Sequence, residues 1–205
     1  LDIAQVKAVN NYSKFNLPEA PLLLLEFHGS KSSVKEQSEL FNEISKDFGG
    51  NNFEWSSSVE ERNKLWKARH DVYYAVKASR PEAEYIATDV CVPISRLSEC
   101  IMETIEDMEK NNLYGPIVGH VGDGNFHVQL MIDPKIQKEV DVANDFLERL
   151  AHRAINMDGT CTGEHGVGQG KKQYLLDELG PAVDFMKLIK QELDPKGIMN
   201  PGKIL

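Results

Sequence analysis

The chain has 205 residues, enough for one domain or for a large part of a multidomain protein. Its formal net charge of −9, with no run of lysine or arginine, argues against a nucleic-acid-binding surface. Three cysteines without a CxxC pair argue against a disulfide framework or a cysteine-based zinc site, and they fit a reducing compartment. No run of about 18 apolar residues occurs, so we expect no membrane span. The first residues show no targeting pattern and open directly into helical spacing, as in a piece of a longer protein.

The first half of the chain alternates predicted helices with short predicted strands. Apolar residues at helical spacing, among them Leu40, Phe41 and Ile44, indicate helices, and compact apolar runs indicate strands. Gly49-Gly50 stops the second helix, and Pro81 lies just beyond the third. The expected elements are a helix over 1–15, a strand over 21–27, a helix over 33–48, a short strand over 53–56 and a helix over 59–79.

The second half of the chain contains the predicted hairpin. A Gly-Asp-Gly-Asn turn separates two apolar runs, and Asp158-Gly159 ends the long helix that follows them. The expected elements are a strand over 86–92, a helix over 93–110, strands over 117–121 and 126–132, and helices over 140–157, 171–178 and 183–192.

Few short strands together with a hairpin predict an α+β fold, in which an antiparallel sheet packs against helices on one face. A doubly wound parallel sheet agrees less well with this order of elements. We expect one domain over residues 1–205. The glycine-rich stretch 163–170 has no clear strand before it and no GKS or GKT ending, so it does not predict a nucleotide loop.

His120 and His127 flank the predicted turn. If the turn is centred on Asp123-Gly124, His120 lies directly opposite His127 on one face of the hairpin. Two imidazoles placed in this way can hold one metal ion. The alternative is a pair of histidines at a polar turn without a ligand.

Glu164 and His165 lie in a second segment, the loop over 160–168, where three glycines in six residues leave room for a ligand. Two histidines and one carboxylate form a recurrent catalytic metal set. His165 cannot easily bind the same ion as its neighbour, so it is free to act as a base. The alternative is a solvated Glu-His pair in a flexible loop.

Three strings in this order carry a family resemblance: GHVGDGNFH at 119–127, GTCTGEHGVG at 159–168 and NPGKIL at 200–205. With LEFHG at 25–29, LWKARHDVYYA at 65–75 and TDVCVPISRL at 88–97, they make the chain resemble the C-terminal domain of FAD-linked oxidases of the vanillyl-alcohol-oxidase type. The resemblance covers essentially the whole chain. Within the family it is stronger to the D-lactate dehydrogenases than to glycolate oxidase subunits or D-2-hydroxyglutarate dehydrogenases.

The resemblance implies roles for particular residues. It implies zinc or manganese held by His120, His127 and Glu164, with His165 taking the proton of the substrate hydroxyl. It implies that Arg69 pairs with the substrate carboxylate, although spacing alone does not choose it over the other arginines of the chain, among them Arg62, Arg80 and Arg96. It also implies that the tail with Asn200 and Lys203 faces the flavin.

The resemblance also implies partners and a place in the cell. FAD would be held mainly by an N-terminal domain that this chain lacks, so we expect no turnover by the chain alone. The implied substrate is a D-2-hydroxy acid, the implied electron acceptor cytochrome c and the implied location mitochondrial. Hydroxyglutarate-type relatives carry a Lys where this chain has Ala87 or Thr88, and an Asn where it has Gln129. The missing Lys favours a monocarboxylic substrate such as D-lactate.

Two other function classes stay open from the residues themselves. One is a hydrolase that uses the same three metal ligands with a water molecule. The other is a non-catalytic α+β binding module in which both motifs are only turns.

Overall fold

Strand β4 (Asn125–Ile132) is the centre of the computed structural model, which describes every residue from Leu1 to Leu205. Strands β1 (Glu84–Ala87) and β2 (Val90–Cys91) lie in line along one edge of β4, and β3 (Ile117–His120) lies along the other. All of these pairings are antiparallel. The strand bounds agree with the predicted hairpin to within about one residue.

The strand expected over 86–92 forms, but it is interrupted at Thr88 and Asp89. The pairing register is the same on both sides of the break, with Ala87 opposite Gln129 and Val90 opposite Phe126. At the break the Thr88 hydroxyl oxygen accepts the Val128 N–H at 2.8 Å. The Thr88 hydroxyl therefore takes the place of one main-chain carbonyl oxygen in the β-ladder. The side chains next to this break can then make contacts outside the sheet.

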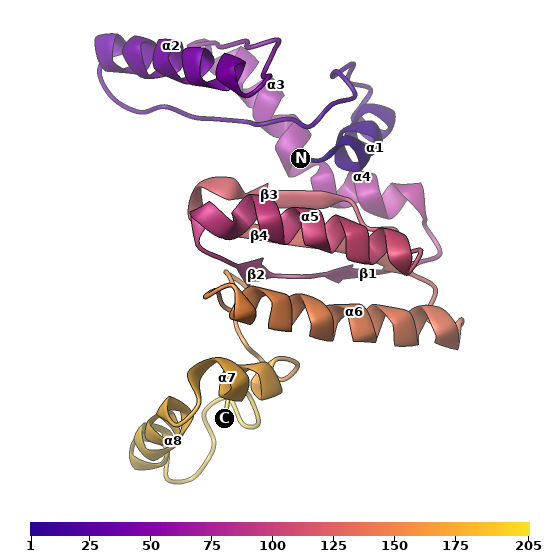
Figure 1. Cartoon of the computed structure of the whole chain (residues 1–205), viewed down its shortest axis with the longest axis vertical. Helices are drawn as coiled ribbons and strands as arrows, with labels where there is room; N and C mark the ends of the chain where they lie inside the picture. Colours follow the sequence, from indigo (N-terminus) through magenta and orange to yellow (C-terminus); the bar gives the residue numbers. More distant parts are fainter.

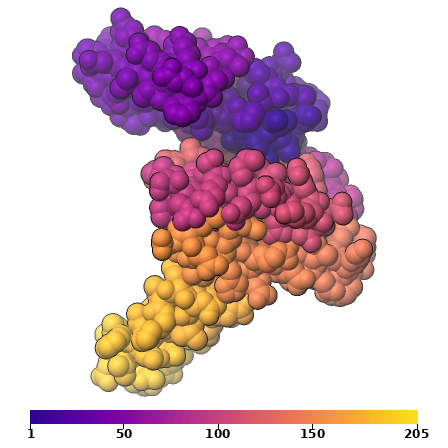
Figure 2. Space-filling view, viewed as in Figure 1, coloured from indigo at the N-terminus to yellow at the C-terminus, as the bar shows by residue number.

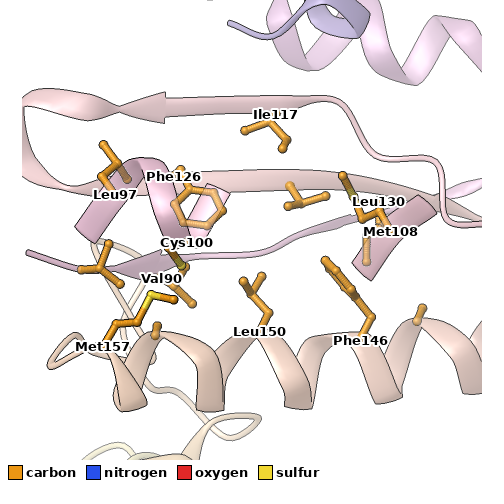
Figure 3. Close-up of a cluster of buried hydrophobic side chains, with 14 of the residues drawn as sticks. Val90, Leu97, Cys100, Met108, Ile117, Phe126, Leu130, Phe146, Leu150 and Met157 are labelled. Atoms are coloured by element: carbon orange, nitrogen blue, oxygen red, sulfur yellow. The ribbon is translucent and has the colours of Figure 1, made fainter. Parts of the chain in front are cut away.

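One face of the sheet carries the main hydrophobic core, because successive side chains of a strand point to opposite faces. Helices α5 (Ile94–Lys110) and α6 (Gln137–Asn156) cover this face (Figures 1 and 3). Phe146 and Leu150 of α6 are almost completely buried there. The β4 residues that point into this core are Phe126, Val128, Leu130 and Ile132.

The second face of the sheet also contacts helices. The side chains of Val118 and Met131 point away from the first core, and they pack with residues of α1 (Ile3–Ser13) and α4 (Val72–Ser79). The predicted α+β class and antiparallel sheet are confirmed, and the helical cover extends to part of a face that we expected to be open. The polar side chains of β4 on this face, Asn125, His127 and Gln129, are buried as well.

Three of the predicted elements differ from the structure. Residues 21–27 and 53–56 form no strand, because neither segment has a ladder partner; Leu22 exchanges only one pair of backbone hydrogen bonds with Leu1. The helix expected over 59–79 is divided at Asp71 into α3 (Val59–His70) and α4. The Asp71 carboxylate accepts a hydrogen bond from Ser13 at 2.6 Å, which anchors this break to the end of α1.

The segment around residues 25–55 and the C-terminal part of the chain extend the molecule in opposite directions, whereas the N-terminus lies beside the sheet (Figures 1 and 2). Helix α2 (Lys31–Asp47) lies at one end, and α7 (Lys172–Leu179) and α8 (Ala182–Leu193) lie at the other (Figure 1). Measured against the thickness of a bilayer, every helix is too short or too polar to span it.

The core predicts a strong dependence on Leu150, which is 1% exposed between α6 and the sheet. We expect Leu150→Ala to lower the free energy of unfolding by about 2–5 kcal/mol, from lost burial and the cavity left behind. Urea unfolding measures this loss. The matched control is Met102→Ala on α5, where the side chain is 55% exposed and the change should stay within about 0.5 kcal/mol. Equal losses for the two variants would contradict this core.

Candidate metal and catalytic site

The β3–β4 hairpin has a register that differs from the predicted one. His120 lies opposite Asn125, and His127 lies opposite Val118. The predicted direct His120–His127 pairing is therefore wrong by two residues. A shift of two keeps each side chain on its face of the sheet, since the side-chain period is two. The two imidazoles still face the same space, with ring centroids 6.1 Å apart.

The turn itself explains the shift. The loop comprises residues 121–124, with a short 3₁₀ turn at Val121–Asp123, so its centre lies between Gly122 and Asp123, one residue earlier than the expected centre at Asp123-Gly124. Gly124 closes the turn with a φ of 77°, and any Cβ there would overlap the Val92 carbonyl oxygen. Glycine is thus required at this position by both conformation and space.

His127 is oriented by a backbone hydrogen bond. Its side chain is 7% exposed, and its Nδ1 lies 2.9 Å from the Thr88 carbonyl oxygen. A carbonyl only accepts hydrogen bonds, so Nδ1 carries the proton and donates it. In the neutral ring, Nε2 therefore presents its lone pair to the site, as is usual for histidines that bind metals.

Glu164 brings a carboxylate to both histidines. Its Oε1 lies 3.0 Å from His127 Nε2 and 3.5 Å from His120 Nε2, and one ligand atom from each residue lies within 4.8 Å of the others. Ligand atoms held about 2.0–2.2 Å from an ion at near-tetrahedral angles lie about 3.3–3.6 Å apart. The three side chains therefore fit the donor set of a small divalent ion such as zinc or manganese.

In a second combination, Asp89 with His127 and His165, one ligand atom from each residue also lies within 4.8 Å of the others. It is the weaker candidate, because His127 Nδ1 is directed to the Thr88 carbonyl. The oxygens of Asp89 are also already occupied by hydrogen bonds from the protein.

His165 lies beside this set. Its ring stacks on that of His127, with centroids 5.0 Å apart and planes inclined by 11°, and its Nε2 lies 3.9 Å from Glu164 Oε1. Half of the side chain is exposed. An imidazole in this position reaches both the polar cluster and a molecule arriving from outside.

Arg69 of α3 is the arginine at the cluster, with Nη2 at 3.4 Å from His120 Nε2. The other three arginines weighed from the sequence have acidic partners elsewhere: Glu26 near Arg62, Glu139 for Arg80 and Glu99 for Arg96. A guanidinium suits recognition of a carboxylate through two parallel hydrogen bonds.

Asp89 is a residue of the site that the sequence reasoning missed. Its side chain is 1% exposed and accepts hydrogen bonds from Asn125 and from the loop that carries Glu164 and His165. Burial by itself raises the pKa of Asp89, but hydrogen bonds, first from the His165 N–H and then from Asn125 and Thr162, outweigh it and lower the pKa far below its ordinary value. Asp89 is therefore a buried, ionised carboxylate.

Asn125 and Lys171 were also not predicted from the sequence as residues of this site. The Asn125 amide donates to Asp89 and to the Val90 carbonyl oxygen, both at 2.9 Å. Lys171 donates to the carbonyl oxygens of Asp89 and Cys161. The available signal was the polar pair Thr88-Asp89 inside an apolar strand pattern, since buried polar side chains need partners.

The tail lies apart from the cluster. Asn200 and Lys203 are both exposed, and neither forms a hydrogen bond or ion pair with the histidines or Glu164. The Ile204 N–H donates to the Gly168 carbonyl oxygen at 2.7 Å, so the tail packs against the end of the glycine-rich loop. The predicted contact of Asn200 and Lys203 with a flavin stays a prediction.

The loop predicts a sharp difference between two of its glycines. A Cβ at Gly163 would overlap the Asn125 side-chain amide and lie 2.8 Å from Asp89 Oδ1. We expect Gly163→Ala to destabilise the protein by about 1–3 kcal/mol through overpacking. Gly170→Ala is the control, because nothing lies within 4 Å of a Cβ there. Denaturant unfolding of the two variants measures the difference, and a stable Gly163→Ala protein would contradict the packing of this loop.

Comparison with known proteins extends over the whole chain. The family described as "FAD linked oxidases, C-terminal domain" matches residues 1–204. The chain is 51% identical over 206 residues to "Probable D-lactate dehydrogenase, mitochondrial" of Danio rerio, and 41% identical over 206 residues to a mitochondrial D-lactate dehydrogenase (cytochrome) of Arabidopsis thaliana. Each alignment covers 100% of this chain, but only 41% and 36% of the respective relative.

More distant relatives agree with this similarity. Glycolate oxidase subunit GlcD of Bacillus subtilis is 30% identical over 207 residues, which cover 100% of this chain and 44% of that protein. The chain thus spans about two fifths of the length of the curated relatives it matches. The structure of 4-ethylphenol oxidase from Gulosibacter chungangensis superposes with a TM-score of 0.61 at 16% identity, over 86% of this chain and 37% of that one. That likeness concerns the fold alone.

Proposed function

This chain belongs to the family of FAD-linked oxidase C-terminal domains, and from that membership we propose that it is the substrate- and metal-binding part of an FAD-dependent D-2-hydroxyacid dehydrogenase. The proposed reaction oxidises D-lactate to pyruvate. The support comes from relatives named as D-lactate dehydrogenases and from the site geometry.

The observation that carries the proposal is the convergence of His120, His127 and Glu164 with His165 and Arg69. Three elements far apart in the sequence supply these side chains: α3, the β3–β4 hairpin and the loop after α6. A divalent ion on the first three side chains supplies Lewis acidity, which favours ionisation of a substrate hydroxyl. Zinc and manganese both accept nitrogen and oxygen ligands of this kind.

The side chains of this chain divide the remaining work. Arg69 binds the carboxylate of the hydroxy acid and fixes its orientation beside the cluster. His165 accepts the proton of the 2-hydroxyl through an imidazole nitrogen. FAD, when bound by the rest of the protein, would supply the acceptor for the hydride on C2, so that the C–O bond would become the carbonyl of the 2-oxo acid. Loss of one proton and one hydride therefore accounts for the oxidation of the hydroxy acid to the 2-oxo acid.

The site face also supports a monocarboxylic substrate. Ala87 lies opposite Gln129 in the sheet, and the Gln129 amide donates to the Tyr85 hydroxyl at 3.1 Å. Neither position offers a cation for a second carboxylate. D-Lactate, with one carboxylate and a methyl group, has no such need.

The proposal includes partners outside this chain. The FAD-binding domain would come from the remainder of a protein as long as the relatives, and α8 offers it an exposed apolar surface. The residues of this surface are Phe185, Leu188, Ile189 and Leu193. A cytochrome as electron acceptor and a mitochondrial location are proposed from the names of the relatives, and cytochrome c in particular from the family resemblance of the sequence.

The test uses the full-length protein with its FAD. We expect anaerobic D-lactate to reduce the flavin, and L-lactate to leave it oxidised. His165→Ala should slow flavin reduction by about 100- to 10,000-fold, the usual contribution of a positioned base. Stopped-flow absorbance of the flavin measures both rates.

The matched control is His152→Ala, which removes a half-exposed histidine of α6 outside the cluster. Its rate should equal that of the unaltered protein. A His165→Ala protein that reduces its flavin at the full rate would remove His165 from the role of base.

A further inference from the structure

We propose that Asp89 is the positioning residue of this site, holding Glu164 and His165 in place through their backbone N–H groups. The proposal rests on the proposed function, because it takes Glu164 as a metal ligand and His165 as the base. Asp89 is not one of the three proposed ligands, because both of its oxygens already accept hydrogen bonds from the protein.

Three successive backbone N–H groups converge on one oxygen of Asp89. The distances to Oδ2 are 2.8 Å from Gly163, 3.1 Å from Glu164 and 2.9 Å from His165. Consecutive N–H groups directed at one point form an anion-binding concavity. Here the anion is a side chain of the same protein, so binding it fixes the backbone under two functional side chains at once.

The same carboxylate ties the loop to the strand that carries His127. Asn125 donates from Nδ2 to Asp89 Oδ1 at 2.9 Å, and Asn125 lies two residues before His127 on the same face of β4. The site therefore has one common reference point for ligands that are 37 positions apart in the sequence, His127 and Glu164. Gly163 permits this close approach, since any side chain there would displace Asn125.

Two further contacts hold the backbone around Asp89. Cys91 and Thr160 exchange hydrogen bonds of 3.2 and 2.8 Å, which joins the strand to the start of the loop. Lys171 donates to the carbonyl oxygens of Asp89 and Cys161 at 2.6 and 2.7 Å, and its ammonium lies 3.8 Å from Asp89 Oδ2. The ammonium offsets part of the cost of burying the carboxylate charge.

A carboxylate is required here because both of its oxygens accept hydrogen bonds. In Asp89→Asn, one oxygen becomes an NH₂ group. This group would face either the three loop N–H groups or the Asn125 amide, and donor would meet donor in a buried place. The side chain keeps its size, so the variant tests hydrogen bonding and charge without leaving a cavity.

The experiment compares full-length, FAD-containing protein with Asp89→Asn. Three quantities are measured: hydrogen exchange of peptides covering residues 160–168, affinity for Mn²⁺ by competition with a chelator, and kcat and KM for D-lactate. We expect faster exchange in the loop, Mn²⁺ affinity lower by about 10- to 100-fold, and kcat lower by about 100-fold with KM changed far less.

Asp107→Asn is the matched control. Asp107 is also a buried carboxylate, but it pairs with Arg149 and Arg153 between α5 and α6. Its loss should lower the free energy of unfolding while leaving loop exchange, Mn²⁺ affinity and kcat unchanged. Unaltered values of these three quantities in Asp89→Asn would overturn the proposal, as would equal changes in both variants.

Thr162→Val decides the matter if Asp89→Asn does not fold. The Thr162 hydroxyl donates to Asp89 Oδ2 at 2.9 Å, so its removal weakens the same anchor by one bond. We expect effects in the same direction, of about 2- to 10-fold; no effect would contradict the anchor. An unaltered protein that neither binds Mn²⁺ nor oxidises D-lactate would refute the proposed function, whereas loop exchange in the variants would still decide whether Asp89 holds the loop.

Discussion

The alternation of side chains along β4 is the constraint on which the rest of the structure depends. One face of this strand carries the apolar residues that pack on α5 and α6, and the other carries Asn125, His127 and Gln129. Every other strand pairs with β4, so a slip of one residue would expose the core and bury the site on the wrong side. Stability and site geometry are therefore set by the same register.

The polar face of the sheet contains a buried charge, the Asp89 carboxylate, and the hydrogen bonds around this carboxylate stabilise it there. Breaking the strand at Thr88 and Asp89 removes part of the ladder and directs the carboxylate toward the loop after α6. That loop forms neither a helix nor a strand. Its backbone N–H groups therefore donate their hydrogen bonds to the Asp89 carboxylate and not to a neighbouring strand. A flexible, glycine-rich segment becomes a defined support for Glu164 and His165 because its N–H groups have one common acceptor.

Sequence reasoning recovered the helices of the second half, the hairpin and the grouping of His120, His127, Glu164 and His165, because these depend on local spacing and on recognisable motifs. The hairpin register was wrong by two residues, because the turn is centred one residue before Asp123-Gly124, on a 3₁₀ turn that has no clear local signal. The grouping was kept, since a shift of two leaves each side chain on its face of the sheet.

The elements that failed depend on tertiary partners. The apolar run over 21–27 has strand composition but no neighbouring strand, so it stays extended and unpaired. Asp89 escaped notice because its hydrogen-bond partners are distant in the sequence: one is Asn125, and the others lie more than 70 residues later, at Thr162 to His165. A buried acid inside a strand was a readable signal that some distant donor group must exist.

The most direct test of the metal centre is elemental analysis of the full-length protein beside its His127→Ala and His152→Ala variants. We expect about one zinc or manganese ion per chain in the unaltered protein and in His152→Ala, and loss of that ion in His127→Ala. Equal metal content in all three proteins, or none in the unaltered protein, would contradict a metal site formed by His120, His127 and Glu164.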